Sequence, residues 1–248
     1  MALPIIECRD VSKAFTLRTN RQYLLKDRVL GLVRPQLREG GTRFWALQSV
    51  SLAVDPREAF GIVGPNGAGK TTLFRIMAGI FQPTSGTVRI RGRIAPLLAL
   101  GTAFHAELTG RENIYLSAAL YGFTTPEIRS VESAVIEFSE LGHFIDVPIK
   151  NYSSGMQLRL GFSIAAQLRP DVFLLDEVLG VGDAHFQQKC LRHLEHERMI
   201  GRTFVVVTHN LDFVEDTCDR AALLVQGRVA AIGAAKDVVH HYRTLAGD

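Results

Sequence analysis

The fold of this chain is decided by the stretch Gly64-Pro65-Asn66-Gly67-Ala68-Gly69-Lys70-Thr71-Thr72. It fits the phosphate-loop pattern of glycine, four variable residues, Gly-Lys and then Ser or Thr. The apolar run at 59–63 precedes it and predicts a buried strand, and an apolar helix is expected to begin near Lys70. Because both flanks agree with the pattern, we interpret the stretch as a site for a nucleoside triphosphate rather than an ordinary glycine-rich turn.

Each residue type in this loop has a chemical reason. The glycines let the backbone turn so that successive N–H groups point into one concavity, and the helix that follows adds its positive end. Lys70 supplies a positive charge for the outer phosphates, and the Thr71 hydroxyl is a suitable Mg²⁺ ligand. The loop therefore predicts a bound triphosphate accompanied by a magnesium ion.

Composition limits the class of protein. The chain has 248 residues, enough for one large domain or two small ones, with 47% hydrophobic and 21% charged residues, as in ordinary globular proteins. A net charge of +3 does not by itself call for nucleic acid, and no apolar run is long enough for a membrane span. Cys8, Cys190 and Cys218 are odd in number and widely spaced, which fits a reducing cytosol rather than a disulfide framework.

Strand-like and helix-like patterns alternate along the chain. Strands are expected at 5–11, 46–54, 59–63, 87–91, 172–175 and 203–208, and at 221–225 and 228–232 around a Gln226-Gly227 hairpin turn. Further helices are expected at 111–121, from an N-cap at Thr125 with Pro126 in the first turn, from Ser153 or Ser154 to 168, at 184–200 and from 235 onward. The alternation predicts an α/β fold with a mostly parallel sheet and an inserted helical lobe.

These patterns divide a single domain, residues 1–248, into parts. The core is expected at about 1–93 and 169–225, the helical lobe at about 94–168, and a C-terminal hairpin and helix at about 226–248.

A basic stretch interrupts the first part of the chain. Residues 18–43 hold seven Lys or Arg against two acidic residues, and apolar residues recur there at helical spacing until Pro35. Such a piece suits an anionic membrane surface, where each basic residue gains about 1 kcal/mol. The alternative is a solvated insertion that covers the nucleotide edge, which we favour because the segment is short and its apolar face is narrow.

Three polar residues follow buried strands at the predicted ligand edge of the sheet. Asp176 and Glu177 end the apolar run at 172–175, and His209 follows the strand at 203–208. Ligands of open parallel sheets bind at the C-terminal ends of the strands. Asp176 is therefore expected to hold Mg²⁺ alongside Thr71, Glu177 to act as general base on the attacking water, and His209 to contact the terminal phosphate or that water.

Together these motifs resemble the nucleotide-binding subunits of ATP-binding cassette (ABC) transporters over nearly the whole chain. Tyr152-Ser153-Ser154-Gly155-Met156 stands where the family has its signature Leu-Ser-Gly-Gly-Gln, and Asp183 stands at the position of the D-loop aspartate. The resemblance implies ATP and Mg²⁺ as ligands and a homodimer in which Ser153, Ser154 and Gly155 cap the γ-phosphate held by the other copy. It also implies a separate membrane permease and a peripheral location on the cytoplasmic face of the membrane.

Sequence variants narrow the resemblance to a subfamily. Residues 152–156, 176–186 and 92–101 resemble exporters of O-antigen, capsule and teichoic-acid polysaccharides, which work with an ABC-2 type permease. Another exporter cargo, such as a drug or a lipid, and a soluble cassette protein acting on nucleic acid or ribosomes are the alternatives. The chain departs from the family in having no glutamine at 94–104, where the Q-loop glutamine is expected.

An aromatic side chain is expected to stack on the adenine base. Phe15 matches the family position best, and Phe44 and Trp45 are the alternatives.

Overall fold

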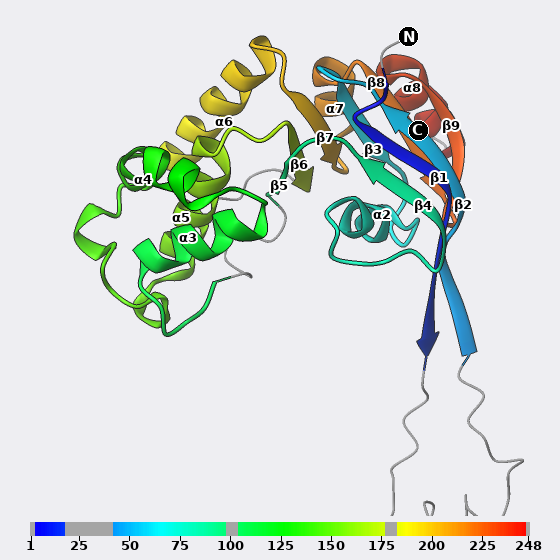
Figure 1. Ribbon diagram of the computed structural model, residues 1–248. Coiled ribbons are helices and arrows are strands. Elements are labelled where there is room, and N and C mark those ends of the chain that lie inside the picture. Colours follow the sequence, from blue (N-terminus) through cyan, green and yellow to red (C-terminus); the bar gives the residue numbers. More distant parts are fainter. Residues whose placement is uncertain (1–2, 18–41, 98–103, 177–182, 247–248) are drawn as a thin grey trace, which may run out of the picture.

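The structure, a computed structural model, describes residues 3–17, 42–97, 104–176 and 183–246 (Figure 1). Its centre is a six-stranded sheet with the order β5-β6-β7-β3-β8-β9. The strands are β3 (Ala59–Val63), β5 (Ile94–Pro96), β6 (Val172–Asp176), β7 (Thr203–Val207), β8 (Arg220–Val225) and β9 (Arg228–Ala234). All neighbouring pairs are parallel except β8 and β9, so the expected mostly parallel sheet with a terminal hairpin is confirmed.

A second sheet covers one face of the first. It is three-stranded, with the order β2-β1-β4, and contains β1 (Ile6–Leu17), β2 (Thr42–Val54) and β4 (Ser85–Ile90). Helix α2 (Lys70–Met77) lies between the two sheets, where Leu73, Phe74 and Met77 are fully buried. The helix that starts at the phosphate loop is therefore part of the core, which fixes the position of its N-terminus.

Helices cover the opposite face of the six-stranded sheet. They are α6 (Ala184–Met199), α7 (Leu211–Thr217) and α8 (Ala235–Ala246), and they bury Phe186, Val214 and Val239 against the strands. All three cysteines are buried and unpaired, and burial raises the pKa of each thiol to about 12. No helix in the described parts of the chain has the length and apolar character that crossing a bilayer requires.

The helical lobe stands beside this core and has a hydrophobic centre of its own (Figure 1). It consists of α3 (Gly110–Leu120), α4 (Thr125–Ser139) and α5 (Ser154–Gln167), with short 3₁₀ turns η2 (Gly142–Phe144) and η3 (Ile149–Asn151). Ile114, Ile128 and Leu160 are buried where the three helices meet. The inserted lobe expected from the sequence is therefore present.

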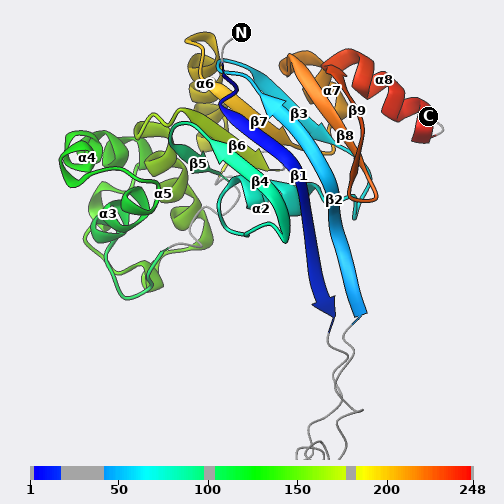
Figure 2. The same ribbon diagram turned by 45° about the vertical axis from the view of Figure 1, so that its right-hand side comes forward.

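The first two strands are longer than predicted. Beyond Lys13↔Leu47 they pair with each other as far as Leu17↔Thr42, and this two-stranded part projects from the body (Figures 1 and 2). Register shifts between Cys8 and Lys13, with Asp10 at φ 48°, break the apolar alternation that sequence reasoning relies on. Residues 18–41 of the basic segment lie outside the described residues.

The helical lobe begins later than the sequence pattern suggested. Ile94–Pro96 is β5, a strand parallel to β6, and not the start of a helical segment. The Leu97 N–H also donates to the Leu174 carbonyl at 2.8 Å. Three residues ending in proline are too few to show a strand period, and only pairing with β6 defines them.

Two local predictions need correction. The N-cap of α4 is Thr124, not Thr125: the Thr124 N–H and hydroxyl both donate to the Glu127 carboxylate at 2.7 Å. These bonds, with Arg93, lower the pKa of Glu127 to about 2. Helix α7 was not predicted, because its seven residues are too few to show a helical period.

We expect Thr124→Ala to lower the free energy of unfolding by about 1 kcal/mol, because the capping box at the start of α4 is lost. Thr125→Ala is the matched control, and we expect a change within about 0.5 kcal/mol because this residue already lies in the helix. Denaturant unfolding of both variants measures the difference. Equal losses, or a larger loss for Thr125→Ala, would place the cap where the sequence first suggested.

Candidate functional site

The phosphate loop joins β3 to α2 at a point where the chain leaves no room for side chains. A Cβ at Gly64, which has φ +145°, would lie 2.1 Å from the Leu224 carbonyl oxygen of β8. A Cβ at Gly69, which has φ +101°, would lie 2.5 Å from the Ala46 carbonyl oxygen of β2. Glycine at both positions lets the loop run against two neighbouring strands, so its shape is fixed by backbone contacts.

Helix α2 begins at Lys70 without a side-chain cap and without an acidic residue in its first turn. The first N–H groups of a helix have no partner within it, so this end suits an anion. Lys70 is 6% exposed, and its ammonium donates to the carbonyls of Gly64 at 2.6 Å and Pro65 at 3.1 Å. The positive charge is thus held over the loop, and the residues present fit a polyphosphate.

A cavity of about 350 Å³ opens beside this loop. Its size falls within the range of small-molecule sites. The lining residues are Phe44, Ala46, Asn66, Gly67, Ala68, Gly69, Lys70, Thr71, Thr72, Asp176, Val207 and His209. The structure therefore brings the loop, the end of β6 and the end of β7 together, as the strand-end argument predicted.

The oxygen and nitrogen groups at the strand ends suit a metal–nucleotide complex. Asp176 is the last residue of β6 and lines the same cavity as the Thr71 hydroxyl. In the described part of the chain no cluster of three His, Cys, Asp or Glu residues could hold a metal alone. Mg²⁺ commonly binds through one or two protein oxygens plus substrate phosphates, so Thr71 and Asp176 fit that role.

His209 and Glu177 were predicted to act on the water and the terminal phosphate. His209 is exposed, follows β7 and lines the cavity, immediately before Asn210 caps α7 by accepting from the Phe213 N–H at 3.0 Å. Glu177 lies outside the described residues; its neighbour Asp176 reaches the cavity.

The signature residues do not line this cavity within one protomer. Ser153 caps α5, and its hydroxyl oxygen accepts from the Met156 N–H at 3.2 Å. Ser153 and Ser154 are exposed, whereas Tyr152 is buried and donates to the Phe144 carbonyl at 2.6 Å. The start of α5 is thus a fixed, accessible helix N-terminus on the helical lobe.

Asp183 is exposed and begins α6. It accepts from the Phe186 N–H at 3.0 Å and forms an ion pair with Arg159 of α5. The hydrogen bond from Phe186 and then the Arg159 guanidinium hold the pKa of Asp183 below its ordinary value. Arg159 was missed from the sequence, because nothing in the pattern shows that α5 and α6 approach each other at this point.

The structure favours Phe44 as the aromatic residue at the cavity. Phe44 is 51% exposed and lines the cavity, and its cross-strand neighbour Phe15 does not. The Phe15 ring packs edge-on against Phe81, with ring centroids 5.7 Å apart. The Arg43 guanidinium lies over Trp45, 5.2 Å from the centre of the Trp45 ring. Phe15 therefore packs against Phe81, and Phe44 is the aromatic residue among the described residues that line the cavity.

Three features together define an ATP-binding cassette: a parallel sheet with a phosphate loop, an inserted helical lobe and an N-terminal antiparallel sheet. The sequence matches the ABC transporter family model over residues 47–180. The chain belongs to the ABC transporter family, as the sequence resemblance indicated, and is an ATPase of that family.

Named relatives share most of the chain. It is 42% identical over 240 residues to the O-antigen export system ATP-binding protein RfbB of Klebsiella pneumoniae, covering 97% of this chain and 98% of that protein. It is 42% identical to the teichoic acids export ATP-binding protein TagH of Lactiplantibacillus plantarum, covering 98% of this chain and 65% of that protein. The structure of an ABC transporter ATP-binding subunit matches with a TM-score of 0.71 and 23% identity, over 98% of this chain and 93% of that one.

We expect Phe44→Ala to weaken ATP binding about tenfold, because the adenine base loses the aromatic ring on which it stacks. Phe15→Ala is the matched control: it removes the contact with Phe81 and should lower the free energy of unfolding by about 1 kcal/mol while leaving ATP affinity nearly unchanged. Titration with a fluorescent ATP analogue measures both affinities. Loss of affinity in Phe15→Ala alone would restore the first assignment.

Proposed function

We propose that this chain is the ATP-hydrolysing subunit of an exporter that moves a lipid-linked polysaccharide, of O-antigen, capsule or teichoic-acid type, across the cytoplasmic membrane. The cargo class is supported by relatives named for O-antigen and teichoic-acid export, one of which matches over nearly the full length of both chains. A separate permease of the ABC-2 type forms the conduit, and the chain sits peripherally on its cytoplasmic side.

The observation that carries the proposal is that two helix N-termini suited to bind an anion, those of α2 and α5, lie in different parts of the chain. The described residues that line the cavity, among them the phosphate loop, Asp176 and His209, all belong to the core, and the exposed start of α5 lies on the lobe. Each is the N-terminus of a helix or adjoins one, and each favours negative charge. A second copy in head-to-tail orientation supplies the missing helix end, with Ser153, Ser154 and Gly155 facing the triphosphate of the first.

Within this site the side chains divide the work of phosphoryl transfer. The Lys70 ammonium and backbone N–H groups of the loop around Gly67 and Gly69 hold the ATP phosphates, and Phe44 stacks on the base. Thr71 and Asp176 would hold Mg²⁺, which would neutralise charge on the phosphates when bound. Glu177 takes the proton of the attacking water and His209 orients that water or the terminal phosphate. Closing the dimer brings in the second helix end and excludes bulk water, and opening after hydrolysis resets the permease.

Glu177→Gln is expected to lower kcat by about 10²- to 10⁴-fold while retaining ATP binding, because the general base is lost but the phosphate contacts remain. ATP should then hold the variant as a dimer in size-exclusion chromatography with light scattering. Lys70→Ala is the control that should lose ATP binding and remain monomeric. Hydrolysis by Glu177→Gln at the parent rate would remove Glu177 from its role.

The cargo class is tested in membranes. Co-expression with a candidate ABC-2 type permease should yield a complex whose ATPase activity rises when a lipid-linked polysaccharide is added. Stimulation by a drug or by an unmodified lipid, with none by the glycan lipid, would favour the other exporter class. Co-purification with RNA and no membrane protein would contradict transport altogether.

A further inference from the structure

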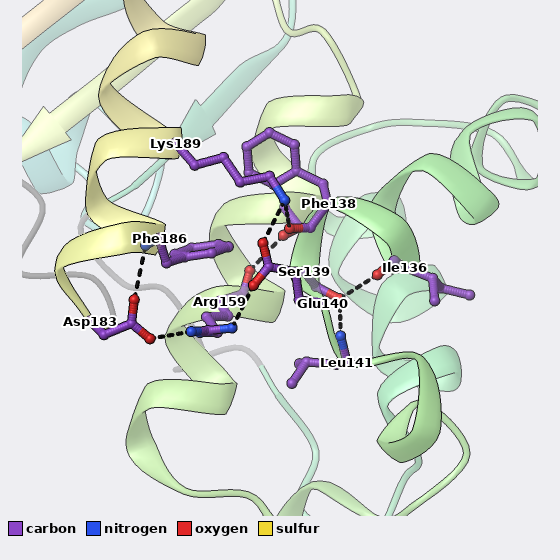
Figure 3. A network of polar contacts seen from close by, with 10 residues as sticks. Ile136, Phe138, Ser139, Glu140, Leu141, Arg159, Asp183, Phe186 and Lys189 are labelled. Atoms are coloured by element: carbon purple, nitrogen blue, oxygen red, sulfur yellow. Dashed lines mark hydrogen bonds and ion pairs between the residues drawn. The ribbon is translucent and has the colours of Figure 1, made fainter.

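A chain of four alternating charges joins the helical lobe to α6 (Figure 3). Arg159 of α5 donates through Nη1 to Glu140 at 3.0 Å, and its Nη2 pairs with Asp183. Lys189 of α6 donates to the other oxygen of Glu140 at 2.9 Å. Glu140 is the C-cap of α4 in the left-handed conformation, so three helices meet at this network.

Arg159 is the member that pairs with Asp183, whereas the ion pair of Lys189 is with Glu140. Its side chain is only 20% exposed, and its guanidinium lies 4.9 Å from the centre of the Phe186 ring. A planar guanidinium can hold one carboxylate on each terminal nitrogen, and stacking on a ring restricts its orientation. Lysine, with a single ammonium, cannot reproduce this fixed fork. Arg159 therefore holds Glu140 and Asp183 at a set distance from each other.

The Arg159–Asp183 ion pair joins two elements that follow the two halves of the proposed composite site: α5 begins at the signature residues, and α6 follows Asp176 along the chain. Arg159 lies about two turns along α5 from Ser153, which opens the helix proposed to face the partner's triphosphate. Asp183 is the residue at which the chain, having left the cavity at Asp176, enters α6. The ion pair thus connects the middle of α5 to the residue that begins α6.

We propose that Arg159 is a positioning residue for ATP hydrolysis. By holding Asp183, it ties α5 to the start of α6, so that the lobe and the core approach a partner copy as one unit. The inference rests on the proposed function. Neither Glu140 nor Asp183 lines the nucleotide cavity, so the bridge acts on turnover and not on the first binding of ATP.

A second arginine provides a matched control. Arg111 of α3 donates from Nε to Asp146 at 2.7 Å and also pairs with Glu132 of α4. Like Arg159 it bridges two carboxylates, but all three residues belong to the helical lobe. Replacing Arg111 therefore removes comparable ion pairs without loosening the lobe from α6.

The test compares Arg159→Gln with Arg111→Gln in the full chain bound to its permease. ATPase activity that depends on Lys70 in the parent first establishes the hydrolysis on which the proposed function depends, so a failure there is distinct from a failure of this inference. Arg159→Gln should then lower kcat about tenfold, with ATP affinity changed less than about twofold and a fall in unfolding temperature no larger than that of Arg111→Gln. Arg111→Gln should leave kcat within about twofold of the parent.

Two more variants separate bridging from simple charge. Arg159→Lys should also lower kcat, because one ammonium cannot hold both carboxylates. Glu140→Gln should lower kcat about threefold on its own, and the double variant with Arg159→Gln should lose less than the product of the two single losses, since the two side chains share one contact. Glu140→Gln alone tests the inference if Arg159→Gln does not fold, because it leaves the Asp183 cap of α6 in place.

Several results would overturn the role of Arg159. They are parent-level kcat in Arg159→Gln or Glu140→Gln, full rescue by Arg159→Lys, an equal loss of kcat in Arg111→Gln, and a loss of ATP affinity that accounts for the whole effect.

Discussion

The close approach of the phosphate loop to two strands is the constraint on which the rest of the structure depends. The loop lies where the two sheets meet, and carbonyl oxygens of β2 and β8 occupy the space that side chains at Gly69 and Gly64 would need. The turn between β8 and β9 adds a brace, because the Gly227 N–H donates to the Ala68 carbonyl at 2.9 Å and the Gln48 N–H donates to the Gly227 carbonyl at 2.8 Å. The loop is thereby preformed, and binding a triphosphate there does not require ordering it.

The strands beside the phosphate loop bring further polar residues to the cavity. Because β6 and β7 run parallel to β3, their C-terminal ends reach the same edge and deliver Asp176 and His209 to the cavity. The helical lobe, by contrast, is placed by its own hydrophobic centre and by contacts with α6, among them the Arg159 bridge. The proposed site shared between two copies needs both arrangements, one that fixes the phosphate loop and one that carries a helix end to the partner.

The sequence predicted the parts of this molecule whose pattern is local. Four such parts follow from neighbouring residue types: the phosphate loop, the buried strands at 172–175 and 203–208, the Gln226-Gly227 turn, and a helix that begins at Ser153 or Ser154. The structure contains each of them, with strand bounds that differ by one residue and with Ser153 as the N-cap of α5. The parts that were missed depend on contacts between distant segments. β5 exists only because β6 lies beside it, and Arg159 meets Asp183 only because α5 and α6 cross. Choosing Phe44 over Phe15 likewise required knowing that Phe81 packs against Phe15.

The central claim is that one protomer holds half of the catalytic site. A structure of the full chain with a non-hydrolysable ATP analogue tests it most directly. We expect two copies, with each analogue held between Gly64–Thr72 of one protomer and Ser153–Gly155 of its partner. An analogue enclosed by a single protomer, with the start of α5 turned away from every triphosphate, would contradict it.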